Sequence, residues 1–138
     1  MCAEAESVNR QRKKTYVMVG IMVPVALLHF VTGPAYKGPF PGFVNGYLID
    51  ILLPFAVYFL LCPQDAGVAF LRPCFVKAAM VLALGFGVEI AQFFGAPIFG
   101  RTYDPLDFAM YTLGVLAAVV LDTRIFPRVF AFWNHGSG

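Results

Sequence analysis

The sequence predicts an all-α integral membrane protein. Hydrophobic residues make up 59% of the 138 residues and charged residues 13%, and the mean hydropathy is +0.74. Soluble domains carry roughly 25% charged residues. Four apolar segments, each bounded by charge, proline or glycine, come close to the length that a helix needs to cross a bilayer. We therefore expect four transmembrane helices in one antiparallel bundle.

The apolar segments and their connections follow in order along the chain. The expected helices cover residues 16–32, 43–62, 74–94 and 105–121. The stretch GPAYKGPFPG separates the first two, because its prolines remove backbone donors and end helices. The next connection is PQDAGVAFLRP, in which we expect Asp65 to be solvated. The last, GAPIFGRTYD, is short enough to make a helical hairpin.

Lysine and arginine residues predict the orientation, because cytoplasmic loops hold the excess of positive charge. With the N-terminus inside, only Lys37 and Arg101 face outward. We therefore expect both termini to be cytoplasmic. A cleaved signal peptide is the alternative interpretation of the first segment, but no A-x-A cleavage site follows it. The residues expected on the cytoplasmic side are Arg10, Arg12, Lys13, Lys14, Arg72, Lys77, Arg124 and Arg128.

The whole chain, 1–138, is expected to form a single membrane domain. Residues 1–15 form a basic cytoplasmic tail, 16–121 the four-helix bundle and 122–138 an amphipathic, aromatic tail. Arginine mixed with aromatic residues is typical of a segment at the membrane interface. We expect the C-terminal tail to be an interfacial anchor, with docking to a partner as the alternative. Its residues of these kinds are Arg124, Phe126, Arg128, Phe130, Phe132 and Trp133.

Motifs of soluble catalysis are absent from the sequence. There is no Gly-rich phosphate loop, no G-x-S-x-G, no H-E-x-x-H and no C-x-x-C. Cys2, Cys62 and Cys74 have no metal-binding spacing and fall on the predicted reducing side, where disulfides are rare. We therefore expect no cofactor, no metal and no disulfide.

Polar side chains gather near the outer ends of the expected helices. Glu89 and Gln92 fall in the last two turns of the third helix, whereas Asp104 and Asp107 begin the fourth. Asp50 falls about two turns into the second helix, at ~1.5 Å per residue. One polar layer in the outer third of the bilayer is the expected result.

Helical spacing arranges these residues in two stripes that are expected to face each other. Their small residues, Gly85, Gly114 and Ala118, would let the helix backbones approach closely. The stripes consist of Gly85, Glu89 and Gln92 on the third helix and of Asp107, Tyr111, Gly114 and Ala118 on the fourth.

The acidic residues of this layer need partners, because an ionised carboxylate is costly in hydrocarbon. Arg101 is the expected partner, since its guanidinium binds a carboxylate through two hydrogen bonds. One arginine cannot neutralise every carboxyl, so we expect another to be protonated, hydrated in an outer cleft or paired with a ligand's cation. Asp104, with Pro105 after it, also fits the cap of a helix, with Asp107 at its third position.

The polar residues of the last two helices form a pattern that resembles the signature of VanZ-like membrane proteins, small polytopic bacterial proteins named for a teicoplanin-resistance determinant. The second helix matches loosely, through Asp50. Tyr111 stands where these proteins usually carry Asn. The resemblance implies a protein of the bacterial cytoplasmic membrane and cell envelope without established enzymatic chemistry. The matching pattern is Glu89-x-x-Gln92, Arg101-x-x-Asp104-x-x-Asp107 and then Gly114.

Three functions fit these observations. The polar layer binds a lipid headgroup or envelope ligand, or the chain is an accessory subunit that contacts other membrane subunits through its aromatic faces and C-terminal tail. The third is a proton-linked enzyme or carrier, with Glu89 and Asp107 as proton acceptors held by Arg101. Besides the lipid bilayer and these partners, no nucleic acid is expected. The candidate site residues are Asp50, Glu89, Gln92, Arg101, Asp104, Asp107 and Tyr111.

Overall fold

The computed structural model describes residues 1–33, 35–98 and 103–133, and within these ranges it contains helices and loops but no β-strand. Four helical spans are long and apolar enough to cross a membrane, which confirms the all-helical prediction. They are α1 (Cys2–Val31), α4 (Cys74–Phe93), the span Leu48–Ala66 that begins with α3 (Leu48–Leu61), and the span Pro105–Val129 that begins with α5 (Pro105–Val120).

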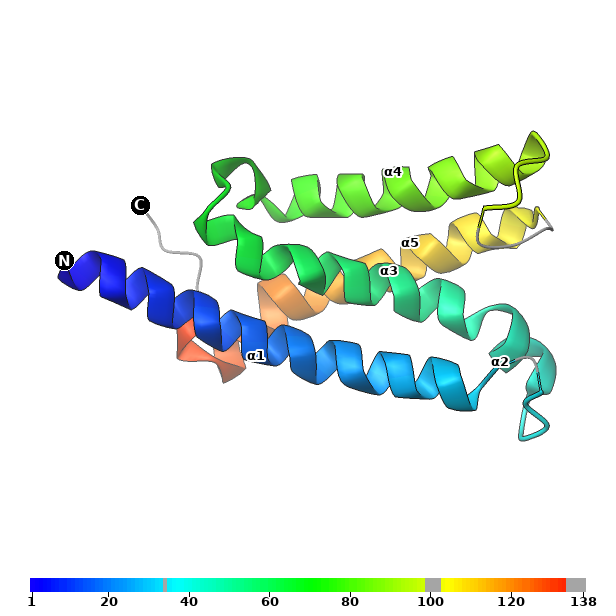
Figure 1. Ribbon diagram of the computed structural model, residues 1–138, viewed down its shortest axis with the longest axis horizontal. Helices are drawn as coiled ribbons and strands as arrows, with labels where there is room; N and C mark the ends of the chain where they lie inside the picture. The colour runs from blue at the N-terminus through cyan, green and yellow to red at the C-terminus, as the bar shows by residue number, and fades with distance from the viewer. Residues whose placement is uncertain (34, 99–102, 134–138) are drawn as a thin grey trace.

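Short helical elements join and extend these spans (Figure 1). They are α2 (Pro41–Gly46), the 3-10 turns η1 (Cys62–Ala66), η2 (Ala69–Leu71) and η4 (Ala131–Trp133), the π-helical turn η3 (Leu121–Ile125), and α6 (Phe126–Val129).

The first helix is longer than the sequence predicted. It begins at Cys2 rather than near residue 16, so the basic N-terminal tail is part of α1. Residues 2–15 contain no glycine or proline and are rich in Ala, Glu, Arg and Lys, which all favour helix. The apolar pattern predicted only the part of α1 that is hydrophobic enough to lie in the membrane.

The second apolar segment is divided into two helices at Tyr47. α2 begins with Pro41 after Phe40, whose φ of 52° is in the left-handed region, and it ends at Gly46. Proline at the first helical position and glycine at the end are typical of helix boundaries. The other two segments match their predictions closely, because α4 covers 74–93 and α5 covers 105–120.

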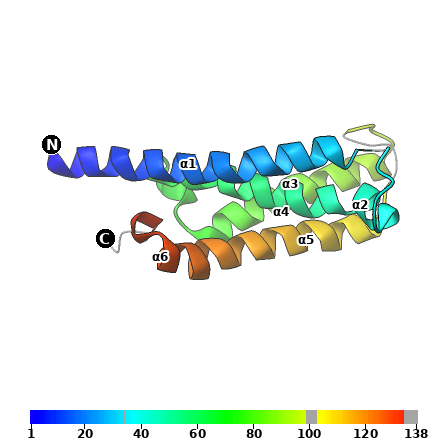
Figure 2. The same ribbon diagram turned by 90° about the horizontal axis from the view of Figure 1, so that it is seen from below.

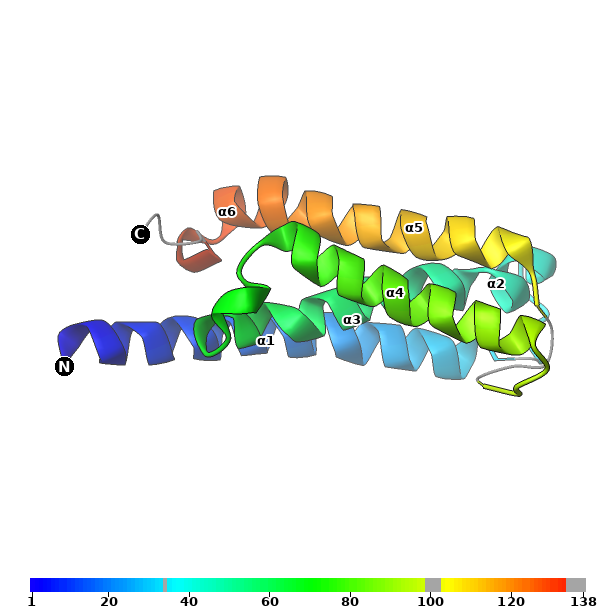
Figure 3. The same cartoon turned by 90° about the horizontal axis from the view of Figure 1, so that it is seen from above.

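The helix α3 packs against α1, α4 and α5, and its contact with α5 is the most extensive in the molecule. Figure 1 shows α3 between α1 and α4, and Figures 2 and 3 show α5 alongside them in two further views. We call one end of this bundle the N-terminal end; it holds the start of α1, η1 and α6. The opposite end, the α2 end, holds α2, the end of α4 and the start of α5 (Figure 1).

The buried core lies where α3, α4, α5 and the C-terminal segment meet. Much of the remaining surface is apolar, including Leu27 and Phe30 on α1, Leu84 on α4 and Leu116 on α5. Such a surface suits contact with hydrocarbon. The core consists of Tyr58, Phe59, Cys62, Val81, Val115, Ala118 and Trp133.

The backbones of α3 and α5 approach each other closely at Gly114. A Cβ atom at residue 114 would collide with the carbonyl oxygen of Ile51 and lie 3.0 Å from Cγ of Pro54. A side chain of any size would therefore push the two backbones apart. By contrast, a Cβ atom at Gly87 on α4 would meet nothing within 4 Å.

Replacing Gly114 by Ala is expected to destabilise the protein by about 1–3 kcal/mol or more, because overpacking forces the α3 and α5 backbones to shift. The measurement is thermal unfolding in detergent micelles followed by circular dichroism. Gly87→Ala is the matched control, and it should leave the stability unchanged or raise it by about 0.5–1 kcal/mol, as Ala favours helix. Equal unfolding of Gly114→Ala and the unmutated protein would contradict the close contact.

Candidate functional site

Three helices bring the predicted acidic residues together at the α2 end. Asp50 is in the first turn of α3, Asp107 is in the first turn of α5, and Glu89 is near the end of α4. Asp50 and Asp107 each interact electrostatically with Glu89. We call Asp50, Glu89, Asp107 and Tyr111 the acidic cluster.

Glu89 is fully buried, with 1% of its surface exposed. Its Oε1 accepts a hydrogen bond from the hydroxyl of Tyr111 at 3.0 Å. The Tyr111 ring fits against α4 because Gly85 has no side chain: a Cβ there would lie 2.9 Å from Cδ2 of Tyr111. The other oxygen, Oε2, has no hydrogen-bond partner among the described residues. A buried carboxylate oxygen without a donor is uncommon and calls for an explanation.

Asp104 caps the helix α5, as its position before Pro105 suggests. Its Oδ1 accepts a hydrogen bond from the backbone N–H of Leu106 at 2.9 Å, and its Oδ2 accepts one from the Tyr47 hydroxyl at 3.2 Å. The hydrogen bond to this carboxylate, together with its negative charge, raises the pKa of Tyr47. Both oxygens of Asp104 therefore have donors, unlike those of Glu89.

Gln92 contributes to the local structure after α4. Its Nε2 donates a hydrogen bond to the carbonyl oxygen of Ile98 at 2.7 Å, and its buried Oε1 has no partner among the described residues. Arg101, the predicted partner of the carboxyls, lies outside the described residues. Its ion pair with the acidic residues therefore stays a prediction.

The small residues of the two predicted stripes contact different helices. Gly85 on α4 faces Tyr111 of α5, whereas Gly114 on α5 faces the α3 backbone. Ala118 is fully buried in the core. Gly114 therefore serves the contact of α5 with α3, and its predicted role in the contact with α4 is wrong.

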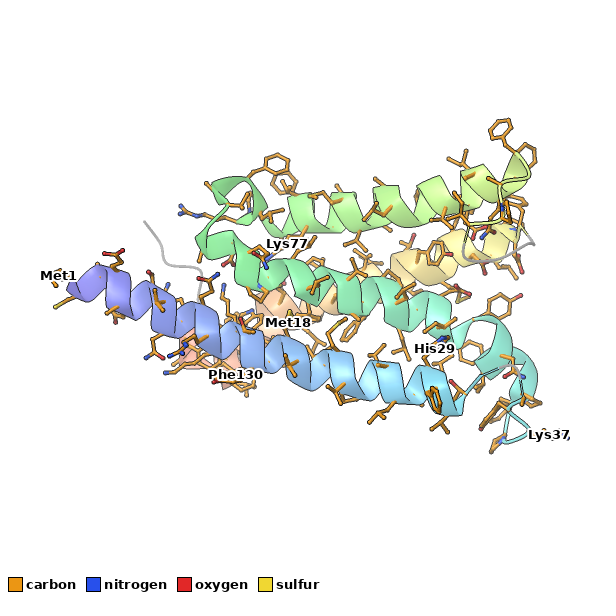
Figure 4. All side chains as sticks on the ribbon, viewed as in Figure 1. Met1, Met18, His29, Lys37, Lys77 and Phe130 are labelled. Carbon is orange, nitrogen blue, oxygen red and sulfur yellow. The ribbon has the colours of Figure 1, made fainter. Side chains whose placement is uncertain are left out.

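A second polar cluster, which sequence reasoning did not predict, is buried toward the N-terminal end. Asp122 Oδ2 lies 3.2 Å from Nζ of Lys77 and accepts a hydrogen bond from the Tyr58 hydroxyl at 2.6 Å. Asp122 Oδ1 accepts a hydrogen bond from Nε1 of Trp133 at 2.7 Å. Figure 4 shows Lys77 near the N-terminal end, with its side chain on the side of α4 that faces α3. We call these four residues the Asp122 cluster.

The Asp122 cluster joins four elements of the structure. Lys77 comes from α4, Tyr58 from α3, Asp122 from the π-helical turn after α5, and Trp133 from η4. All four side chains are buried, and Lys77 Nζ also lies 3.6 Å from Sγ of Cys62. The charges are paired and the donors are used, so this cluster has the properties of a structural tie rather than a binding site.

Asp65 belongs to a further buried ion pair, so the expectation that it is solvated in its loop is wrong. Its Oδ2 lies 2.6 Å from Nζ of Lys14, and both residues are buried. Lys14 in turn lies over the Trp133 ring, 5.5 Å from the centroid. The long α1 makes the pair possible because it carries Lys14 past the η1 turn.

The C-terminal aromatic segment folds onto the bundle. Trp133 is fully buried, and Phe126, Phe130 and Phe132 pack against the core. An interfacial position is therefore wrong for Trp133, whose indole N–H is used by Asp122 inside the protein. A sequence signal did exist: Lys77 lies within an apolar helix, where a cation needs a buried partner.

The described residues hold no group of three His, Cys, Asp or Glu side chains suited to a metal ion. Comparison of the chain with protein-family models, curated proteins and solved structures found no match. The four apolar helical spans indicate a membrane protein, and their packing is that of a helix bundle.

Replacing Lys77 by Met is expected to cost about 3–5 kcal/mol of stability, because it leaves the buried Asp122 charge without its cation. The double variant Lys77→Met with Asp122→Asn removes both charges and keeps an oxygen acceptor, so it should be more stable than Lys77→Met alone. Thermal unfolding in detergent measures both. Arg128→Gln, an exposed change, is the control. A double variant less stable than Lys77→Met would overturn the ion-pair interpretation.

Proposed function

We propose that this chain is a VanZ-like integral membrane protein of the bacterial cell envelope, and that its acidic cluster binds a lipid headgroup or another envelope ligand. The observation that carries this proposal is Glu89, a fully buried carboxylate with one oxygen that has no donor among the described residues. Asp50 and Asp107 interact electrostatically with Glu89, and the side chain of Asp107 is also hydrogen-bonded to Glu89, so that two carboxyls share one proton at most and no described basic residue is paired with them. A cluster that served only to join helices would be expected to pair its charges, as the Asp122 cluster does.

Tyr111 stands where the VanZ-like pattern usually has Asn, and its contacts are compatible with the resemblance. Its hydroxyl donates a hydrogen bond to Glu89 across the contact between α5 and α4. The amide of Asn, the usual residue there, is also a hydrogen-bond donor. The substitution therefore keeps the donor and fills more space, for which Gly85 leaves room.

The proposed topology is an antiparallel bundle in the inner membrane with both termini in the cytoplasm. Lys14 and Lys77 were included among the basic residues predicted on the cytoplasmic side. Both are buried in ion pairs, so they are left out of the charge count that predicts the orientation. The positive bias is still present without them. The exposed basic residues that support it are Arg10, Arg12, Lys13, Arg72, Arg124 and Arg128.

Cysteine labelling in intact cells tests this topology. Cys2 is exposed at the start of α1, and Lys37 is exposed at the α2 end (Figure 4). A membrane-impermeant maleimide should label a Lys37→Cys variant, made in a Cys2→Ser background, and should label Cys2 only after permeabilisation. Labelling of Cys2 but not of residue 37 in intact cells would reverse the proposed orientation.

Native mass spectrometry of gently extracted protein tests the binding function. The unmutated chain is expected to retain a lipid or other envelope molecule, and Glu89→Gln and Asp107→Asn should each reduce the retained fraction. Glu6→Gln is the matched control, because it removes one negative charge from the exposed N-terminal end.

The accessory-subunit hypothesis predicts a different result in the same experiment. A partner protein at fixed stoichiometry, with no small molecule retained at the acidic cluster, would favour that function over ligand binding. This hypothesis also predicted that a partner docks on the C-terminal tail. The structure leaves less of the tail for docking, because Trp133 is buried within its own chain.

A further inference from the structure

The α2 end contains more acid than base, and this imbalance indicates the chemistry of a ligand. Two ion pairs join described residues, Lys14 with Asp65 and Lys77 with Asp122, and neither includes the acidic cluster. Even if Arg101 pairs with one carboxyl, as the sequence predicts, it supplies a single positive charge. Asp50, Glu89 and Asp107 together exceed that charge.

The acceptors of the cluster converge from three helices. Glu89 extends from α4, Asp50 from α3 and Asp107 from α5, and both aspartates interact with Glu89. The Tyr111 hydroxyl donates to Oε1 of Glu89, and the other oxygen, Oε2, has no hydrogen-bond donor among the described residues. A proton shared with Asp107 or a bound donor would satisfy Oε2, and the negative charge of the surrounding carboxyls favours a donor that is a cation.

A primary ammonium group fits these requirements better than the other common cations. It has three N–H donors, one positive charge and no acceptor, so it can donate to more than one carboxylate at once without needing the close grouping of ligands that a metal ion requires. A quaternary ammonium has no N–H donor and is usually held by several aromatic faces. The described residues contain no group suited to a metal ion.

The depth of the cluster also fits a headgroup. Asp50 and Asp107 lie in the first turns of their helices, and both are half-buried. Glu89 lies four residues before the end of α4 at Phe93, which is about 6 Å along a helix axis. The amine of a phospholipid lies near the ends of membrane-spanning helices, which is the part of the helices where these three residues are found.

We propose that the acidic cluster binds a primary ammonium group, with Glu89 Oε2, Asp50 and Asp107 as acceptors. This inference rests on the proposed binding function and names its ligand class. The ammonium belongs either to an aminophospholipid headgroup or to a free amine, and the experiment separates these sources.

Lipid exchange on the delipidated, full-length protein is the first measurement. Phosphatidylethanolamine, phosphatidylcholine and phosphatidylglycerol with identical acyl chains are added separately in detergent, and bound lipid is counted by native mass spectrometry. We expect phosphatidylethanolamine to be retained by roughly tenfold or more over the other two, since its donors reach a desolvated carboxylate. Glu89→Gln and Asp107→Asn should abolish this preference, whereas Glu6→Gln should keep it.

Free ethanolamine distinguishes the two sources of the ammonium. If the ligand is a free amine, ethanolamine should raise the unfolding temperature of the unmutated protein while the three lipids bind equally. N,N,N-trimethylethanolamine (choline) is the matched control, and it should have no effect. Either the lipid preference or the ethanolamine effect, lost in Glu89→Gln, supports the ammonium site.

Other outcomes overturn the inference in distinguishable ways. Preferential retention of phosphatidylglycerol that is lost in Glu89→Gln would leave the binding function in place and refute the ammonium. No lipid preference and no amine effect, with Glu89→Gln unfolding at the same temperature as the unmutated protein, would mean that Glu89 is simply protonated, and both proposals would fail. Asp50→Asn, at a half-buried position, provides a further variant if Glu89→Gln does not fold.

Discussion

The buried pair of Lys77 and Asp122 holds the bundle together at its N-terminal end. Asp122 accepts from Lys77, Tyr58 and Trp133, so one carboxylate joins α4, α3, the end of the α5 span and the C-terminal segment. A carboxylate in such surroundings is tolerated only when its oxygens are all engaged. The π-helical turn that carries Asp122 and the inward fold of Trp133 are the structural features that meet this condition.

The two ends of the molecule handle buried charge in opposite ways. At the N-terminal end, Lys14 and Lys77 each have an acidic partner, and Trp133 lies against both pairs. At the α2 end, carboxylates face one another, and one oxygen of Glu89 has no donor among the described residues. The first arrangement gives rigidity. The second requires an added proton or cation, which is why we propose that binding takes place at the α2 end.

The polar motif of the last two helices contains residues with a structural role as well as residues of the proposed binding site. Asp104 has both oxygens engaged as a helix cap, and Gly114 allows the α3 and α5 backbones to touch. These residues build the fold at the place where Glu89 and Asp107 meet. In the proposed function, the motif combines residues that hold the helices together with residues that bind the ligand.

The sequence by itself determined the membrane class, the four spans and the boundaries of α4 and α5, because hydropathy and helix-ending residues are local properties. It also marked Asp50, Glu89 and Asp107 as neighbours in depth, since helical rise converts sequence position into height. Only the tertiary structure decided which charges are paired. Lys14 with Asp65, and Lys77 with Asp122 and Trp133, join positions far apart in the chain. Such pairing depends on which helix faces meet, and periodicity along one helix contains no information about the rotation of its neighbours.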